Sequence, residues 1–505
     1  MFATGVLADD AGCVEGTAFD GGRHIPGGRD LSLNTRCRHA AAVVCVGLVV
    51  VLADRTRGTE PIQESAAPDP LVQLVIDLLR ENDKEMRALG YEQVRTQARG
   101  GAATSRFADL LPGLSPDAQV GLLSALADRG DAAALPAVRA LLAGDLDPPV
   151  RVAAVGALGV LGETADVERL VELLRTAPPP ERAAARTGLV RLEGPDTPAA
   201  IAAAMKQAAP ASRVALLEIL AARRALETIP DILAAAIDDD PAVRTAAMSA
   251  LGQLAGPQHV PGMVQGVLKA QKGPEREAAE KAVMLVCQRI PDADRRADPL
   301  LLAMRQRANP DRRALLSTLG RVGGPSAWKV VGAALNDNDP QLHDLGLRAL
   351  CNWPDASVAP QLRNLVNGDE HPEHRTLALR ALIRIAPLAD QRSDLERLEL
   401  LQAAMAICER DAERNLALDR ARSIRIPETL RFVLPYVQQP ALAEQACLTV
   451  VELAHDRTLR EPHQAEFHAA LDLVIQTSRD ATVVDRAQRY KKNQTWVRPK
   501  PAGAD

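Results

Sequence analysis

The chain has 505 residues, of which 47% are hydrophobic and 2% are aromatic, and its 60 basic residues nearly balance its 65 acidic ones. A formal charge of −5 excludes a strongly charged surface over the whole chain, so neither a polyanion nor a polycation is the obvious partner. The scarcity of aromatic residues favours a helical core of alanine and leucine and leaves few aromatic anchors for ligands.

The N-terminal part shows no repeat. Residues 1–35 are rich in glycine and aspartate and lack a hydrophobic period, which predicts a disordered segment or one that lies upstream of the true translation start. Ala40–Ala53 is an unbroken apolar run after basic residues, too short for a membrane span but suited to a signal-peptide core. We expect residues 36–53 to be a signal peptide that directs export, for example to a periplasm; an uncleaved N-terminal anchor and a segment without a targeting role are the alternatives. Residues 54–70, with their proline, serine and glutamate, are predicted to be a linker.

A block of sequence recurs within residues 71–390. Asp147 opens D-P-P-V-R-V-A-A-V-G-A-L-G-V-L, and Asp240, 93 residues further on, opens D-P-A-V-R-T-A-A-M-S-A-L-G-Q-L. A looser copy starts at Asp339. Each long block holds three units of about 30 residues, which is the signature of one supersecondary unit stacked many times and copied here as a triplet.

Each unit carries two apolar stretches spaced i, i+3, i+4, i+7 and separated by a break that contains glycine. This pattern is typical of two short amphipathic helices. The best-defined pair of stripes consists of Val150, Ala153, Ala154, Ala157, Leu158 and Leu161, then Val167, Leu170, Val171 and Leu174. Because an isolated pair could not bury both stripes, stability must come from neighbouring units.

The ends of the first helix in each unit are also marked. Asp147, Asp240 and Asp339 each precede a proline, which suits an N-cap acceptor followed by the first helical position. Gly159 and Gly252 sit where we expect this helix to end or bend.

The two ends of the stack depart from the regular unit. Leu71–Arg80 and Lys84–Gln97 are predicted to form an opening cap. Residues 391–487 are predicted to be divergent helical repeats that close the stack, with helices at Ser393–Arg410, Leu416–Arg425, Glu428–Val437 and Ala441–His455. Residues 488–505 are rich in lysine and arginine and are predicted to be a disordered basic tail.

The D-P-x-V-R-x-A-A-x-x-A-L-G-x-L string resembles the HEAT repeat, in particular the short bacterial variety first associated with phycobilisome lyases. The resemblance implies an all-α fold, a right-handed α-α superhelix of about 10–13 helix pairs, with the second helix of each unit on the concave side. It also implies that Asp147, Arg151, Asp240 and Arg244 belong to a structural ladder of hydrogen bonds between successive turns. It implies no single activity, because such repeats serve scaffolds, adaptors and a few enzymes.

One cluster could be imagined as a metal site. Asp369-Glu370-His371-Pro372-Glu373-His374 brings carboxylates and imidazoles together at close spacing. The repeats favour a structural role instead, because His374 stands where earlier copies have Arg182 and Arg276. His343 likewise stands where they have Arg151 and Arg244.

Other patterns in the sequence predict no metal site or catalytic site. The runs Asp238–Asp240 and Asn336–Asp339 lack the glycine and late glutamate of a calcium loop and are interpreted as turns with an N-cap. None of the nine histidines precedes a glutamate, the dipeptide of the HEAT-type iron enzyme deoxyhypusine hydroxylase. Four cysteines and two tryptophans within the repeats are predicted to be core residues: Cys287, Cys351, Cys408, Cys447, Trp328 and Trp353.

We predict an exported, non-catalytic scaffold that holds a protein partner on its concave surface, with no cofactor, no metal and no nucleic acid. Membrane attachment is expected only through an uncleaved N-terminal segment. The alternatives are a lyase-like or cofactor-handling protein and a non-catalytic subunit of a larger envelope enzyme complex.

Overall fold

The structure, a computed structural model, describes residues 69–97, 100–368 and 371–497. Every regular element in these ranges is a helix, so the prediction of an all-α solenoid is confirmed. The helices form two rows. The first row comprises α2 (Lys84–Thr96), α4 (Pro116–Arg129), α6 (Pro148–Leu161), α8 (Pro179–Arg191), α10 (Pro210–Ala222), α12 (Pro241–Leu254), α14 (Pro274–Cys287), the two half-helices α16 (Asn309–Ala314) and α17 (Leu316–Val322), α19 (Pro340–Cys351), α21 (Pro372–Ile385), α23 (Asp411–Ala421), α25 (Ala443–His455) and α28 (Ala481–Lys491).

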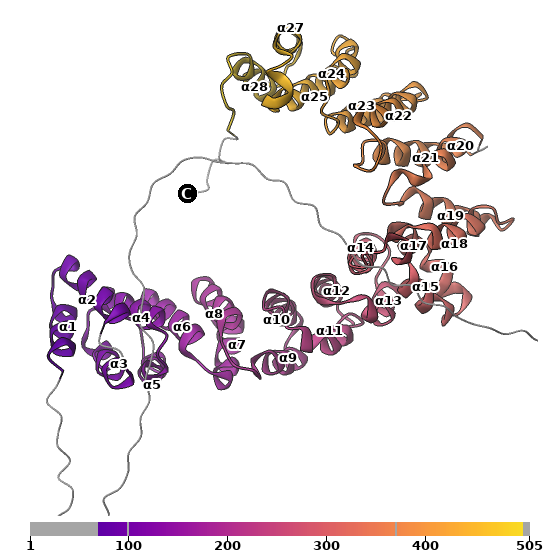
Figure 1. The fold of residues 1–505 in the computed structure, drawn as a ribbon. Helices are drawn as coiled ribbons and strands as arrows, with labels where there is room; N and C mark the ends of the chain where they lie inside the picture. The colour runs from indigo at the N-terminus through magenta and orange to yellow at the C-terminus, as the bar shows by residue number, and fades with distance from the viewer. Residues whose placement is uncertain (1–68, 98–99, 369–370, 498–505) are drawn as a thin grey trace, which may run out of the picture. The chain divides into compact units, whose positions relative to one another are not determined.

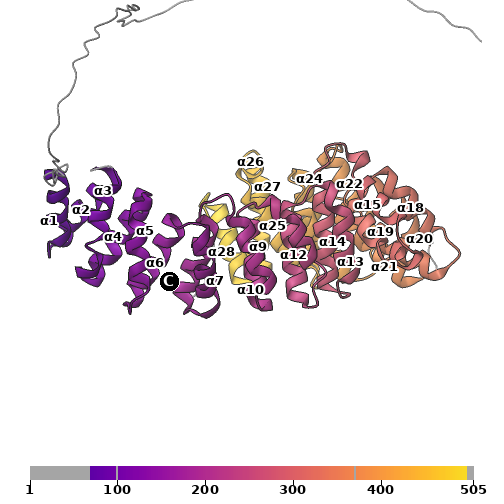
Figure 2. The ribbon, with the colours of Figure 1, turned by 90° about the horizontal axis from the view of Figure 1, so that it is seen from below.

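The second row lies beside the first. It comprises α1 (Pro70–Arg80), α3 (Gly101–Ala108), α5 (Leu135–Leu142), α7 (Val167–Thr176), α9 (Thr197–Gln207), α11 (Ile229–Ala235), α13 (Val260–Lys269), α15 (Asp298–Arg305), α18 (Pro325–Leu335), α20 (Ala359–Gly368), α22 (Asp394–Ala406), α24 (Pro427–Val433) and α27 (Gln464–Thr477), while the short α26 (Arg457–Arg460) follows α25. First-row helices pack on one another in chain order, most extensively where α6 meets α4 and α8 and where α12 meets α10 and α14. Figures 1 and 2 show the helices following one another, each beside its neighbours in sequence.

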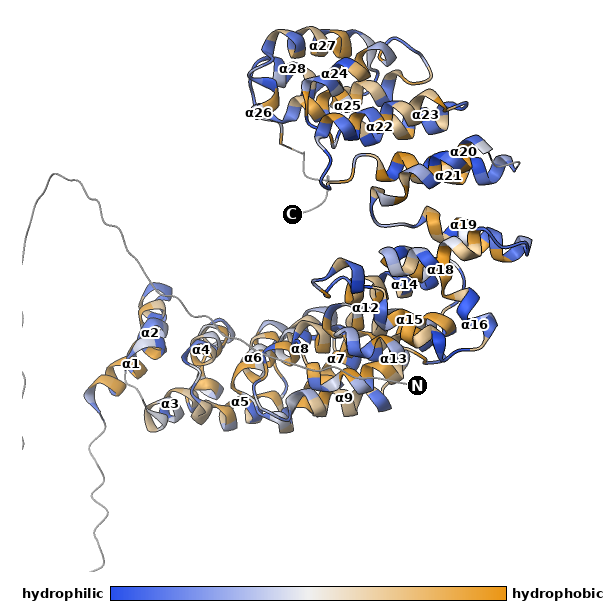
Figure 3. Cartoon of the chain, turned by 45° about the vertical axis from the view of Figure 1, so that its right-hand side comes forward, coloured by the Kyte–Doolittle hydropathy of each residue, from blue (hydrophilic) through white to orange (hydrophobic). Residues whose placement is uncertain are grey.

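The predicted stripes are the surfaces that hold the rows together. In α6, Val150, Ala154 and Leu158 are at most 1% exposed, and in α7, Leu170 is fully buried. Figure 3 shows hydrophobic and hydrophilic residues alternating around the helices throughout the stack. Each buried leucine or valine contributes about 1.5–3 kcal/mol, and it does so only when the next helix covers it.

At two of the three predicted Asp-Pro helix starts, the aspartate caps the helix. Asp240 Oδ1 accepts hydrogen bonds from the backbone N–H groups of Ala242 at 2.8 Å and Val243 at 3.2 Å, and Asp339 likewise caps α19. Asp147 occupies the same position before α6 but its side chain makes no capping hydrogen bond. The reason is Pro149, which stands at the second helical position, where it lacks the N–H that Ala242 donates in α12.

The expectation that α6 ends at Gly159 and α12 at Gly252 is wrong. α6 and α12 continue through them to Leu161 and Leu254. These glycines instead permit close packing within the first row, because a Cβ built on Gly159 would lie 2.2 Å from the Cα of Gly188 in α8. Helix backbones can approach this closely only where side chains are absent from both sides.

Arginines from one first-row helix satisfy carbonyl groups at the C-terminal end of the preceding one. Arg223 Nη2 donates to the Leu192 oxygen at 2.8 Å, and Arg384 Nη2 donates to the Trp353 oxygen at 2.6 Å. Arg129 and Arg289 make the same kind of contact with α2 and α12. These carbonyls have no partner within their own helix, so a cationic donor both satisfies them and complements the helix dipole. Sequence reasoning missed this set, although Arg129 and Arg223 are separated by 94 residues, close to the 93 residues between the repeat copies at Asp147 and Asp240.

The C-terminal repeats differ from prediction at two places. α23 begins at Asp411 rather than near Leu416, because its first turn is acidic and favourable at a helix N-terminus although it carries little hydrophobic signal. Ordered structure also continues past residue 487. Tyr490 is 2% exposed, and the Arg486 guanidinium lies 5.0 Å from the ring centre of Trp496. The basic and aromatic residues that suggested a disordered tail therefore cover the end of the stack through cation–π contacts, while residues 498–505 lie outside the described residues.

Glu413 gives this region a pH dependence. Burial raises the pKa of this carboxyl, but hydrogen bonds from Arg410 and Arg380 outweigh burial and hold the pKa below its ordinary value. A lowered folded-state pKa stabilises the protein above the unfolded value of about 4.3, and the contribution is lost as pH falls through the folded pKa. We expect Glu413→Gln to lower the free energy of unfolding by about 1–2 kcal/mol at pH 7 and by less at pH ~3, where protonation of the carboxyl removes part of the contribution. Urea unfolding at both pH values measures the difference, and an equal loss at both would contradict the assignment.

Candidate functional site

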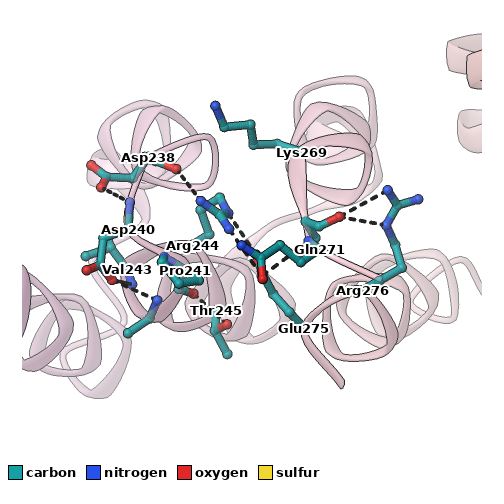
Figure 4. Close-up of polar contacts among 12 residues, drawn as sticks. Asp238, Asp240, Pro241, Val243, Arg244, Thr245, Lys269, Gln271, Glu275 and Arg276 are labelled. Atoms are coloured by element: carbon teal, nitrogen blue, oxygen red, sulfur yellow. Dashed lines mark hydrogen bonds and ion pairs between the residues drawn. The ribbon is translucent and has the colours of Figure 1, made fainter. Parts of the chain in front are cut away.

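The ladder residues of α12 form a buried polar junction between two repeats. Arg244 Nε donates to Glu275 Oε1 at 2.7 Å and Nη2 donates to Oε2 at 3.2 Å, while Nη1 donates to the carbonyl oxygens of Asp238 and Asp239, each at 2.8 Å. The Arg244 side chain is 4% exposed and that of Glu275 is 13% exposed. Figure 4 shows the guanidinium lying between the turn at Asp238 and the start of α14. The hydrogen bond with Glu275 raises the pKa of Arg244, which keeps its positive charge in this site.

The equivalent residues of α6 make a weaker junction. Arg151 Nη2 donates to the Gly144 oxygen at 3.2 Å, which ties the start of α6 to the end of the preceding second-row helix. Asp147 and Arg151 lie at the start of α6, and Asp240 and Arg244 at the start of α12, with α8 and α10 between these helices in the first row. The structure therefore does not bring the four residues together, and each pair makes local contacts. These contacts satisfy backbone groups and join helices, which is a structural role without chemistry of its own.

The histidine cluster lies at the starts of α19 and α21. His374 is 9% exposed, and its ring centre lies 4.8 Å from that of His371 and 5.6 Å from that of His343. His374 Nε2 is 3.6 Å from Asp344 Oδ1, and His343 Nδ1 is 2.6 Å from the Leu335 oxygen. Asp369 and Glu370 lie outside the described residues. Within the described ranges, this cluster included, no group of three His, Cys, Asp or Glu side chains has a geometry suited to a metal. His343 thus contacts a preceding carbonyl oxygen in the same way as Arg151 and Arg244, which hold the same position in the earlier repeats.

Cysteines and tryptophans mostly lie in the core. Cys287, Cys408 and Cys447 are buried and Cys351 is partly buried. Burial raises the pKa of Cys287 to about 12, which keeps this thiol protonated and poorly nucleophilic. Trp353 is 1% exposed, and its Nε1 donates to Ser357 Oγ at 3.1 Å.

A hollow lies between α15 and α18 of the second row and α16, α17 and α19 of the first row, and we call it the apolar groove. Its volume is about 770 Å³, and its aliphatic lining includes Leu301, Leu302, Leu316, Val330 and Leu342. The groove occurs where the first row is irregular, because α16 and α17 are separated by a turn at Leu315. In Figure 3, α15 is largely hydrophobic whereas α16 is hydrophilic. Leu302 is 54% exposed, although it belongs to the apolar lining.

The rim of the apolar groove is mainly basic. Four cationic and two acidic side chains line it: Arg305, Arg312, Arg313, Lys329, Asp298 and Asp337. Arg313 pairs with Asp339 at 2.9 Å and Asp298 pairs with Arg295 at 3.4 Å. Within residues 69–97, 100–368 and 371–497, Arg305 and Lys329 take part in no ion pair. The rim can therefore attract carboxylates to a floor that favours apolar side chains. Sequence reasoning missed this site, because its residues come from several helices and the sequence pattern of one helix does not show how far away the next helix lies.

Among the described residues, no helix has the length and apolar character needed to cross a bilayer. The predicted signal peptide at 36–53 and the linker at 54–70 lie almost wholly outside those residues, because only Asp69 and Pro70 are described.

Three solved structures are similar to this chain at low sequence identity. The structure of Kap121p bound to Pho4p has 13% sequence identity and a TM-score of 0.44, and the match covers 85% of this chain and 54% of that one. The karyopherin Kap121p bound to the SUMO protease Ulp1p has 13% identity and a TM-score of 0.45, covering 83% of this chain and 52% of that one. Human deoxyhypusine hydroxylase in complex with glycerol has 17% identity and a TM-score of 0.22, covering 67% of this chain and 99% of that one.

This chain thus spans about half the length of the karyopherin chains, and likenesses at these scores carry no argument about this chain. No curated protein sequence matches the chain. The family model described as HEAT repeats matches residues 105–190 and 197–284. It does not test the resemblance to the short bacterial variety. The match spans the end of α3, the helices α4–α13 and most of α14, and it shows that this part of the chain consists of HEAT repeats.

Proposed function

We propose that this protein is an interaction scaffold that holds a segment of a partner protein in the apolar groove. Its HEAT repeats support this role, because stacked helix pairs present extended surfaces whose residues come from many units. The scaffold would act without catalysis, since arginine and lysine dominate the polar rim and these side chains bind anions by charge and hydrogen bonds.

The observation that carries the proposal is the pairing of an aliphatic floor with a basic rim. A floor that includes Leu301, Leu302 and Val330 favours a bulky apolar side chain, whose burial contributes about 1.5–3 kcal/mol. Arg305 and Lys329 on the rim favour carboxylates on either side of that side chain. The proposed occupant is therefore a short protein segment with an apolar anchor flanked by aspartate or glutamate.

A peptide library displayed on phage and selected against the full-length protein tests this directly. We expect the selected peptides to share an apolar anchor beside acidic residues. Leu302→Asp should weaken their binding at least about tenfold, because it places a charge on the floor of the groove and repels the flanking carboxylates. Leu226→Asp is the matched control, because Leu226 is 58% exposed and Leu302 is 54% exposed, but Leu226 does not line the groove. Peptides that bind both variants equally well, or a selection that returns no acidic-apolar motif, would contradict the proposal.

We further propose that the protein is exported by the apolar segment Ala40–Ala53, supported by its length and by the basic residues before it. N-terminal sequencing of the protein isolated from its source should then give a mature chain that starts at Asp54. If the isolated protein retains the apolar segment and is found with the membrane, the segment is an uncleaved anchor and not a signal peptide. If the protein retains the segment and is found in the soluble cytoplasmic fraction, the proposal of export is contradicted.

A further inference from the structure

A second hollow lies on the first row, formed by α14, α17, α19 and α21, and we call it the arginine groove. Its volume is about 750 Å³. Two carboxylates line it, Glu277 and Glu280. Six cationic side chains line it: Lys272, Arg276, Arg321, Arg348, Arg380 and Arg384. This positive concentration stands out in a chain whose basic and acidic residues are otherwise nearly balanced.

Carboxylates offset only part of this charge: Glu277 lines the groove, and Arg380 pairs with Glu413 at 2.9 Å although the Arg380 side chain is 51% exposed. Glu280 is 3% exposed and is fully engaged below the surface, where it accepts from Arg321 Nε at 2.9 Å and from Ser317 Oγ at 3.0 Å. Arg348 donates one hydrogen bond from its Nε to Asp344, at 2.8 Å. The rest of its half-exposed guanidinium remains open to the groove. Lys272 makes no ion pair with any residue in the described part of the chain. Donor capacity therefore remains along the groove.

The positive charges in the arginine groove also repel one another. Burial lowers the pKa of Arg384, and the positive charges of Arg321 and Arg420 lower it further. Arg384 is held in place because it donates to the carbonyl oxygens of Cys351 and Trp353. A fixed cluster of like charges is stabilised when an anion binds, and this gain adds to the direct attraction.

The arrangement distinguishes an extended anion from a compact one. Arg321, Arg348 and Arg380 come from three successive first-row helices, and packed helices lie about 8–10 Å apart. A polyproline II segment rises about 3.1 Å per residue with three residues per turn, so every third side chain falls on one face about 9 Å apart. We propose that the arginine groove binds an extended acidic segment of a partner protein with a carboxylate at every third residue. This site is lined by different residues from those of the apolar groove and does not depend on the function proposed for that groove.

Binding of defined peptides to the full-length protein, measured by fluorescence anisotropy, tests the proposal. The probe is a labelled peptide with four Glu-Pro-Pro repeats. A second peptide has the same composition with its four glutamates adjacent, and a third has glutamine in place of glutamate. We expect the spaced acidic peptide to bind most tightly, the clustered one more weakly and the glutamine one not at all, with affinity falling as salt is added.

Variants assign the binding to the groove. Arg348→Gln should weaken binding about threefold, and Arg348→Gln combined with Lys272→Gln about tenfold, because each removes one partly exposed charge contact. Arg175→Gln is the matched control, since Arg175 is 57% exposed, close to the 56% of Arg348, and also pairs with a carboxylate on its own helix, but outside the groove. Circular dichroism checks that each variant is folded. Three outcomes would overturn the proposal. The spaced and clustered peptides could bind with equal affinity, or the wild type and the double variant could bind the spaced peptide equally well. The third is that a 12-nucleotide oligothymidine binds more tightly than the peptide and that the same variants abolish its binding.

Discussion

Replacing Arg244 with alanine is expected to lower the free energy of unfolding by about 3–5 kcal/mol. The substitution leaves Glu275 without its bidentate partner in a site where that carboxylate is 13% exposed, and it frees the carbonyl groups of Asp238 and Asp239. A buried charge without a counter-ion costs far more than the loss of a surface pair. Urea unfolding followed by circular dichroism measures the loss.

Arg151→Ala is the matched control, because Arg151 holds the same repeat position with one hydrogen bond, at 3.2 Å. We expect this variant to lose at most about 1 kcal/mol. Because repeat proteins are stabilised by neighbouring interfaces, hydrogen exchange should show the effect of Arg244→Ala concentrated in α12–α14. Equal losses in the two variants would show that the contact with Glu275 contributes nothing beyond the helix-start hydrogen bond.

Gly159→Ala is expected to destabilise the protein by about 1–3 kcal/mol, although alanine favours a helix over glycine by about 1 kcal/mol. The new methyl group would lie 2.2 Å from the Cα of Gly188, so the backbones of α6 and α8 must separate. The loss of contact along that whole interface outweighs the gain in helix propensity.

The equivalent substitution in the next long block separates the two effects. A Cβ on Gly252 would lie 3.3 Å from Ala282, a contact that a small shift can relieve. Gly252→Ala should therefore be neutral or stabilising by up to about 1 kcal/mol. Thermal unfolding of both variants gives the comparison, and a stable Gly159→Ala variant would show that the two helices can move apart at little cost.

Much of the fold could be predicted from the sequence because the signal is local. The stripe that includes Val150, Ala154 and Leu158 lies within one helix, so its 3.6-residue period shows both the helix and its buried face. The repeat offset then extends this reading to other units, and proline with aspartate places the helix starts. The same reasoning failed where the pattern is not hydrophobic, as in the acidic first turn of α23.

The candidate sites were decided by the tertiary structure. Arg244 and Glu275 belong to different repeats, and no sequence period pairs them, because the contact requires α12 and α14 to lie side by side. Gly159 has the same sequence signal as a helix terminator, and only the approach of Gly188 shows that it serves packing. The apolar and arginine grooves likewise arise where side chains from several helices face one hollow. The sequence by itself determined the helices and their repetition, because the hydrophobic period and the helix caps act within one turn or one repeat unit. The tertiary structure decided which charged and apolar side chains lie together, because this depends on distances between helices that no single helix encodes.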